Sequence, residues 1–304
     1  MTFTIFASDL AACIGLNQYS NTCNVAKKIW KRESRDSFVV AQKRNNCFDS
    51  PEYNKIDNIR DIVNFIEKEQ YDILKIHIQD AVNSTEGSKL SECMENIQNL
   101  LETSFPQITI PSHSDQLQIQ KSYNNSTDLI SDIKSAIYKE RGTILEDKSI
   151  ANYSRLLSKT VAERNTKFYK KRIQFYYQNE DGTMDRLQVV IGGKIDGVTN
   201  DGELVEVKNR QWKIFDKIPI HEMIQIHIYM YLLDKTSCQI IQCFENEMKI
   251  DNISFSDELW EDIIMRLKIF AKNFSTLLQS EQLQNQLLLE ELFENYFVTY
   301  LVPR

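Results

Sequence analysis

The chain has few glycines and prolines, 8 and 5 respectively among 304 residues. Because β-sandwiches with many turns need these residues in their connections, the scarcity favours a helix-rich architecture. An excess of positive charge is also lacking, since 36 basic residues stand against 43 acidic ones and give a net charge of −7. This excludes a basic coat over the whole surface, so any nucleic-acid binding must come from a local basic groove.

Clustered cysteines and long apolar runs are lacking as well. The six cysteines form no C-x-x-C pair and no histidine accompanies them at zinc spacing: Cys13, Cys23, Cys47, Cys93, Cys238 and Cys243. We therefore expect free thiols in a reducing cytoplasmic or nuclear compartment, without a zinc or iron–sulfur site. The apolar stretch from Phe3 to Leu16 contains Asp9 and follows no cationic segment, which argues against a signal peptide. No run reaches the length of a membrane span.

The N-terminal half has mainly helical periodicity. Residues 7–32 predict a helix capped by Ser8 or Asp9, a break at residues 15–19 and a second helix over 23–31. Residues 56–104 again repeat apolar positions at helical spacing, whereas 105–128 are rich in Ser, Asn, Pro and Gln and predict a loop. We expect a helical region over 1–135 that includes an insertion at about 33–130, because that stretch carries no catalytic motif.

The following part predicts strands. Segments 171–178 and 187–192 alternate around the turn residues 179–182, which predicts a hairpin, and 204–208 follows another turn. Pro219 opens a helix that continues to Leu233, and strands are expected at 238–244 and 249–254 before further helix. The fold class predicted is α/β (α+β), a central mixed sheet flanked by helices, with a core at 136–255 and C-terminal helices at 256–304 packed on it.

Three ionisable residues stand at the ends of these strands. Asp196 precedes a glycine, and Glu206 and Lys208 lie two apart on the next strand, so they share one face. Two carboxylates beside a lysine are suited to metal-assisted hydrolysis of a phosphodiester. A lone E-x-K occurs by chance in most proteins of this size, but its position after a D-G hairpin is more specific. Gln225 and Tyr229 share a face of the next helix, which is also what an ordinary amphipathic helix with a buried tyrosine would give.

These motifs carry a resemblance to a known family. Residues 193–197 (GKIDG), 206–208 (EVK) and 225–229 (QIHIY) resemble successive motifs of the PD-(D/E)xK nucleases, in particular the branch of phage lambda exonuclease and the YqaJ-type viral recombinases, or alkaline exonucleases. Residues 141–146 resemble the G-x-x-x-E helix of that branch, and 7–9 with 15–19 resemble its N-terminal segment. The resemblance covers about 7–32 and 138–245, and it implies a restriction-endonuclease-like fold.

The resemblance also implies roles for individual residues. Asp196, Glu206 and the Val207 carbonyl would hold one or two Mg²⁺ ions, with Mn²⁺ as a substitute, and Glu146 would complete the site directly or through water. Lys208 would orient or deprotonate the attacking water, and Gln225 would position water or substrate.

Contacts to DNA are expected from a few polar side chains. Ser8 matches a segment that holds the 5′-phosphate in lambda-type enzymes, although no arginine can be placed there. Trp212 could stack on a base or pack under a loop, and Tyr229 is a further candidate. Candidate cations are Lys27, Lys28, Arg141, Lys167, Lys170, Lys171, Arg210 and Lys213.

The function expected is a Mg²⁺-dependent deoxyribonuclease, most simply a 5′→3′ exonuclease on double-stranded DNA with free ends. Its single-stranded products would serve recombination, repair or viral DNA processing, with a single-strand annealing protein as a partner, self-association into an oligomer and no membrane association. Alternatives are an endonuclease of the same fold in repair, or a degenerate module that only binds nucleic acid. The complete acid–acid–lysine set argues against the last, since a binding module need not keep a costly cluster of like charges.

Overall fold

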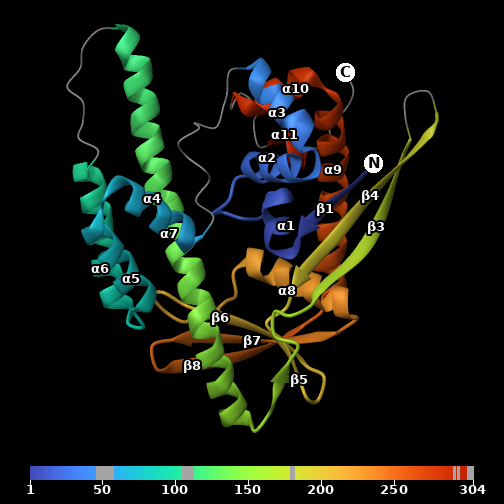
Figure 1. The fold of residues 1–304 in the computed structure, drawn as a ribbon. Coiled ribbons are helices and arrows are strands. Elements are labelled where there is room, and N and C mark those ends of the chain that lie inside the picture. The colour runs from blue at the N-terminus through green and yellow to red at the C-terminus, as the bar shows by residue number, and fades with distance from the viewer. Residues whose placement is uncertain (46–57, 105–112, 179–181, 290–291, 293–294, 300–304) are drawn as a thin grey trace.

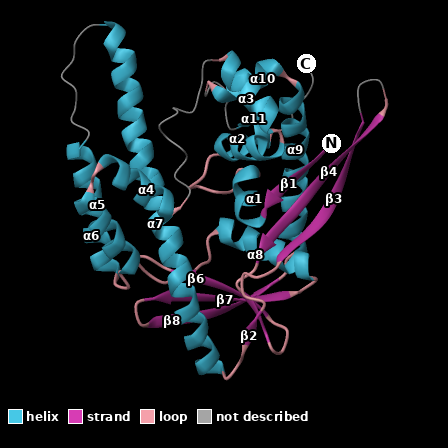
Figure 2. Cartoon of the chain, viewed as in Figure 1, coloured by secondary structure: helices cyan, strands magenta, loops and turns pink. Residues whose placement is uncertain are grey.

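Strands and helices form two mixed β-sheets covered by helices in a computed structural model (Figures 1 and 2). The structure describes residues 1–45, 58–104, 113–178, 182–289, 292 and 295–299. This arrangement confirms the predicted α/β class of mixed sheet and flanking helices, with a helical N-terminal region. One detail differs from the expectation, because the described strands divide between two sheets where one central sheet was expected.

The first sheet has three strands in the order β1-β4-β3, with bounds Thr2–Phe6, Met184–Lys194 and Phe168–Gln178. Strands β3 and β4 form the predicted antiparallel hairpin, although turn residues 179–181 lie outside the described residues. Strand β1 runs parallel to β4 and was not predicted. Its sequence, TFTIF, alternates polar and apolar residues, and both Phe3 and Ile5 are buried. Because a helix follows directly, so short a strand could not be distinguished from the start of that helix.

The second sheet has five strands in the order β2-β5-β6-β7-β8. Their bounds are Val161–Ala162, Gly197–Thr199, Leu204–Asn209, Ser237–Phe244 and Glu247–Ser254. The strands predicted at 204–208, 238–244 and 249–254 are thereby confirmed. Because β6 and β7 are parallel, a crossover must join them, and helix α8 (Ile220–Leu233) provides it.

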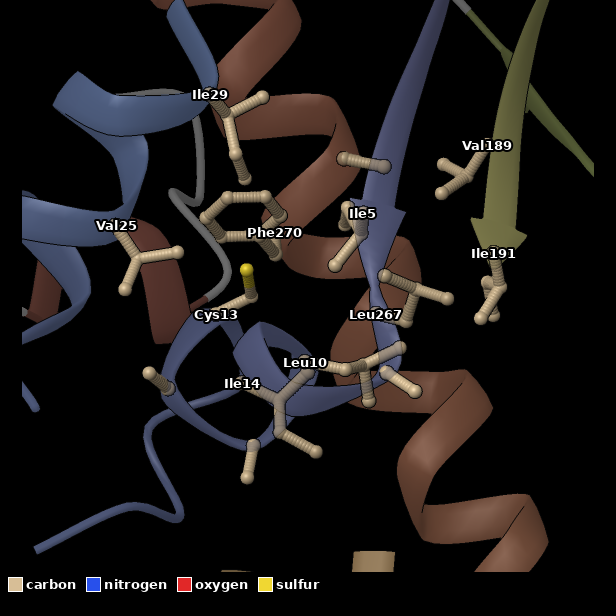
Figure 3. Close-up of a cluster of buried hydrophobic side chains, with 14 of the residues drawn as sticks. Ile5, Leu10, Cys13, Ile14, Val25, Ile29, Val189, Ile191, Leu267 and Phe270 are labelled. Atoms are coloured by element: carbon tan, nitrogen blue, oxygen red, sulfur yellow. The ribbon is translucent and has the colours of Figure 1, made fainter. Parts of the chain in front are cut away.

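Helices from both ends of the chain share the main hydrophobic core (Figure 3). These are α1 (Ala7–Cys13), α2 (Thr22–Glu33), α3 (Arg35–Arg44), α9 (Asp257–Gln279), α10 (Glu281–Leu288) and α11 (Asn295–Val298). Leu10, Ile29 and Phe270 are all fully buried in this core. The predicted cap of α1 is wrong: the N-cap position is Phe6, because β1 leads straight into the helix and places Ser8 and Asp9 inside its first turn.

A helical arm stands beside this body (Figure 1). It comprises α4 (Ile59–Glu69), α5 (Asp72–Asn83), α6 (Gly87–Ser104) and the N-terminal half of α7 (His113–Leu157), and it has a hydrophobic cluster of its own. The loop predicted over 105–128 is wrong from His113 onward, and the boundary expected at 135/136 falls inside α7. Neither Gly nor Pro occurs between residues 112 and 141, so polar composition alone could not interrupt the helix.

The cysteines and the apolar helices are the last features of the fold. Five cysteines within the described residues are free thiols, and Cys47 lies outside those residues. Among the described helices, none is long and apolar enough to cross a bilayer.

Candidate active site

Strand β6 presents Glu206 and Lys208 on the same face, as its period of two predicts. The Lys208 Nζ donates a hydrogen bond of 2.8 Å to Glu206 Oε1. Strands pair with β6 on both sides, so these side chains lie in the middle of the sheet, and Glu206 is only 2% exposed. The chain therefore buries a carboxylate beside a half-buried ammonium group where an apolar pair would be expected.

Asp196 joins the pair from the segment that links the two sheets. It lies between β4 and β5, and its Oδ2 accepts a hydrogen bond of 2.7 Å from the Val207 backbone N–H. The next residue must be glycine, because a Cβ at Gly197 would lie 2.2 Å from Cγ1 of Val161 on β2. The D-G motif is thus explained by an acid aimed at β6 and by close packing of the neighbouring strand.

Helix α8 completes this side of the site with an amide and a phenol. Gln225 Oε1 accepts a hydrogen bond of 3.1 Å from Lys208 Nζ, and Gln225 Nε2 donates one of 3.0 Å to the Tyr229 hydroxyl. Gly193 leaves room for that ring, since a Cβ there would lie 2.8 Å from Tyr229 Cε1. Tyr229 is buried behind Gln225 and accepts its hydrogen bond, and a contact of Tyr229 with DNA stays a prediction.

Glu146 approaches from α7 and is held by a loop that sequence reasoning missed. Its Oε1 accepts a hydrogen bond of 2.8 Å from Asn165 Nδ2, and the Asn165 backbone N–H donates to the Ile195 carbonyl next to Asp196. Glu163 and Asn165 both have left-handed backbones, with φ of 57° and 47°. Asparagine tolerates that conformation better than most residues, which is the only local signal that this loop offers.

Arg164 lies between those two strained residues. Its guanidinium forms an ion pair with Asp147, and its Nε is buried with no hydrogen-bond partner among the described residues. Burial raises the pKa of both Glu146 and Asp196, and the positive charge of Arg164 offsets part of that rise. A strained loop that brings an arginine and an asparagine to two acids is typical of functional sites.

The acids outnumber the positive charge available to them. Burial is the main cause that raises the pKa of Glu146 to about 7, and the negative charge of nearby Asp196 is the second. Burial also raises the pKa of Asp196 and of Glu206, and each carboxyl acts on the other. Burial alone would lower the pKa of Lys208, but Glu206 and Asp196 outweigh it and raise that pKa, so the lysine is charged.

The donor set is suited to a hard divalent cation. Glu206 Oε2 is buried and has no hydrogen-bond partner among the described residues, so one carboxylate oxygen is available to such an ion. Among the described residues no three metal-ligating side chains form one group, so the three-carboxylate set expected from the sequence stays a prediction. Asp196 and Glu206 lie within hydrogen-bonding reach of each other, whereas Glu146 is held by Asn165.

The structure disperses the predicted DNA-contacting residues. Arg141 and Arg210 are buried: Arg141 donates to the Ser84 carbonyl, and Arg210 forms a two-fold ion pair with Glu222 at 2.6 and 2.8 Å. In the structure both arginines are thus engaged by protein groups in the interior, and their contact with DNA stays a prediction. Trp212 is 65% exposed, which excludes packing under a loop.

The remaining candidates lie at or near the surface. Lys28 pairs with Asp9 at 2.9 Å, Lys171 pairs with Asp234, and Lys27 is half-buried on α2. Four others are exposed: Ser8, Lys167, Lys170 and Lys213.

Comparisons with known proteins give weak similarities. No protein family matches the sequence, and no curated protein matches it either. An alkaline exonuclease (LHK-Exo) from Laribacter hongkongensis superimposes with a TM-score of 0.34 and 16% identity, over 46% of this chain and 70% of its own. LHK-Exo in complex with dAMP gives a TM-score of 0.34 and 15% identity, over 67% and 87%. A protein named SSO0001 superimposes with a TM-score of 0.26 and 16% identity, over 58% of this chain and 86% of its own. Similarity at this level assigns neither family nor activity, so the chemistry must follow from the site.

Proposed function

We propose that the protein is a metal-dependent nuclease that hydrolyses phosphodiester bonds of DNA. The observation that carries this proposal is the position of Lys208 Nζ, which bonds to Glu206 Oε1 at 2.8 Å and to Gln225 Oε1 at 3.1 Å. Asp196 lies beside this trio and Glu146 faces it from α7. Acids, lysine and glutamine thus come together from four separate segments in the order that the resemblance to PD-(D/E)xK nucleases predicts.

Mg²⁺ fits the residues present. Asp196, the partnerless Oε2 of Glu206 and the Val207 carbonyl would hold it, with Glu146 contributing directly or through water. When bound, the ion would activate water and neutralise charge that develops on the phosphate. Mn²⁺, which prefers the same oxygen ligands, would substitute for it.

The protein side chains have complementary tasks. Lys208 carries a raised pKa and stays protonated at neutral pH, so it serves to orient water and to stabilise negative charge on the phosphate, and not as a general base. Gln225 has one amide oxygen engaged by Lys208 and its NH₂ group directed to Tyr229, which fixes the amide orientation for contact with water or substrate. Arg164 adds a positive charge near the two acids.

The more specific proposal is a 5′→3′ exonuclease on duplex DNA that leaves single-stranded ends for recombination, repair or viral DNA processing. An annealing protein would take up those ends, and the enzyme itself could assemble as an oligomer. An endonuclease of the same fold and a module that binds DNA without cleaving it are the competing functions.

Incubation of labelled DNA with Mg²⁺ tests these functions together. Linear duplex labelled at either the 5′ or the 3′ end should be degraded from the 5′ end, a closed circle should stay intact, and chelation of Mg²⁺ should stop the reaction. Lys208→Ala and Asp196→Asn should each lose at least about a hundredfold in rate, whereas Lys272→Ala, an exposed lysine on α9, should retain the wild-type rate.

Other outcomes of this experiment would support one of the two competing functions. Cleavage of the circle would favour the endonuclease, and binding without cleavage would favour the degenerate module. Full activity of Lys208→Ala would exclude the proposed site.

A further inference from the structure

A pocket lies on the side of α7 that faces away from Glu146. It has a volume of about 220 Å³ and is formed by α7, Thr85 between α5 and α6, the end of β6 and the hairpin of β7 and β8. Lining positions 141, 145, 148, 152 and 155 of α7 repeat every three or four residues, so they form one stripe along the helix. Glu146 lies two positions before Lys148 and therefore points to nearly the opposite side.

A buried arginine lines this pocket without a counter-ion. Arg141 is 4% exposed, and within the described chain it forms no ion pair with a carboxylate. Its Nε donates a bond of 2.9 Å to the Ser84 carbonyl at the C-terminus of α5, which accounts for one of five N–H groups. The terminal Nη1 and Nη2 donate to no described residue. Burial lowers the pKa of this group, which indicates that the charge lacks an acidic partner.

A buried charge is costly when it is not paired, so an unpaired arginine facing a pocket indicates an anion. Lys148 and Arg155 add two exposed cations, seven and fourteen residues further along the stripe. Asn152 accepts a bond of 3.2 Å from Arg155 through its oxygen, which leaves its NH₂ group as a donor. Two exposed acids, Glu245 and Glu247, also line the pocket, and so does the buried Arg210, which is paired with Glu222. Apart from that pair, three cations line the pocket against two acids, and the buried one, Arg141, is positive.

We propose that this pocket binds a phosphate group. The two terminal nitrogens of Arg141 match a pair of phosphate oxygens in a bidentate arrangement, with Lys148 as the nearer additional charge and Arg155 at the far end of the stripe. The same group could belong to a free phosphate anion or to a phosphodiester in a nucleic-acid strand. The site does not depend on the proposed nuclease activity, because it shares no residue with Asp196, Glu206 or Lys208.

Titration with inorganic phosphate tests the pocket directly. Wild-type protein in chelator, at ionic strength held constant with chloride, should show a saturable rise in unfolding temperature and a calorimetric binding isotherm. The double variant Lys148→Ala/Arg155→Ala changes only exposed side chains, and it should weaken the affinity at least about tenfold. Arg141→Gln should abolish binding, provided that it keeps the wild-type circular dichroism spectrum. Lys139→Ala, on the same helix outside the pocket, should leave the affinity unchanged.

A competition experiment identifies the source of the phosphate. A short thymidine oligonucleotide should compete with inorganic phosphate in the wild type if the natural ligand is a nucleic-acid strand, and it should fail to compete if the ligand is a free anion. Either result supports the site. Equal phosphate affinity in the wild type and the double variant, or no wild-type binding up to tens of millimolar, would overturn it.

Discussion

The two oxygens of Glu206 have different surroundings, and this difference organises the chemistry at the residue scale. Oε1 accepts the Lys208 hydrogen bond, whereas Oε2 is buried with no partner among the described residues. A second acid, Asp196, lies beside it. Burial raises the pKa of both acids despite the positive charge of Lys208, so the metal-free site favours an extra proton, and a divalent cation could take its place.

The first prediction concerns pH. Asp196 and Glu206 have raised pKa values in the folded protein, against 3.8 and 4.5 for exposed groups, so the folded state keeps protons that the unfolded state releases. The free energy of unfolding of the metal-free protein should therefore fall as pH rises from about 4.5 through neutrality. Urea titrations in chelator between pH 5 and 8 measure it. Glu206→Gln should flatten the dependence, and an unchanged slope in that variant would contradict the assignment.

The second prediction concerns the tyrosine behind Gln225. Tyr229→Phe removes the hydroxyl that accepts from Gln225 Nε2, so the amide loses the contact that fixes its orientation. One such hydrogen bond is worth about 1 kcal/mol, so the single-turnover cleavage rate should fall roughly five- to tenfold. DNA affinity should be unchanged, because the ring is buried. Tyr231→Phe, on the same helix and stacked on Trp260, is the matched control. A loss of affinity with an unchanged rate would contradict the role.

At the scale of elements, the sequence predicts those parts of the site that regular periodicity encodes. The alternation of β6 placed Glu206 and Lys208 on one face, and the helical spacing of α8 placed Gln225 with Tyr229. The 163–165 loop was not predictable, because its residues act through strained backbone and contacts to Glu146 that no repeat indicates. Charge was equally uninformative about position, since Arg210 and Glu222 neutralise each other in the interior.

The third prediction separates the two functions of Asn165, whose backbone is left-handed and whose side chain holds Glu146. Asn165→Gly and Asn165→Ala both remove the amide, so both should reduce cleavage by the same factor. Glycine adopts a positive φ without strain, so Asn165→Ala should be less stable by about 1 kcal/mol. Urea unfolding and cleavage rates of the two variants measure these effects. If alanine were the more stable variant, the left-handed backbone at this position would be refuted.

At the scale of the whole molecule, the described residues form a main hydrophobic core, a separate cluster in the helical arm and a smaller third cluster under the second sheet. The main core joins both ends of the chain with the three-stranded sheet, whereas the helical arm has its own buried cluster. Helix α7 contributes to the cluster of the arm and then to a third, smaller cluster, in which Ile150 and Tyr153 pack against Val205, Val207 and Ile241 of the second sheet. The sequence indicated a helical insertion here, but it could not reveal that this insertion continues into the helix that carries Glu146.

The fourth prediction asks whether the arm unfolds separately. Leu101 is buried in the arm on α6, and Leu267 is buried in the main core on α9. Leu101→Ala and Leu267→Ala should each cost about 2–5 kcal/mol at the site of the cavity. Because the clusters are separate, Leu101→Ala should accelerate amide hydrogen exchange in α4, α5 and α6 while β6 stays protected and DNA cleavage stays within twofold. Leu267→Ala should instead accelerate exchange in β1 and β4. Equal loss of protection in β6 and in the arm after Leu101→Ala would show that α7 couples both clusters into one cooperative unit.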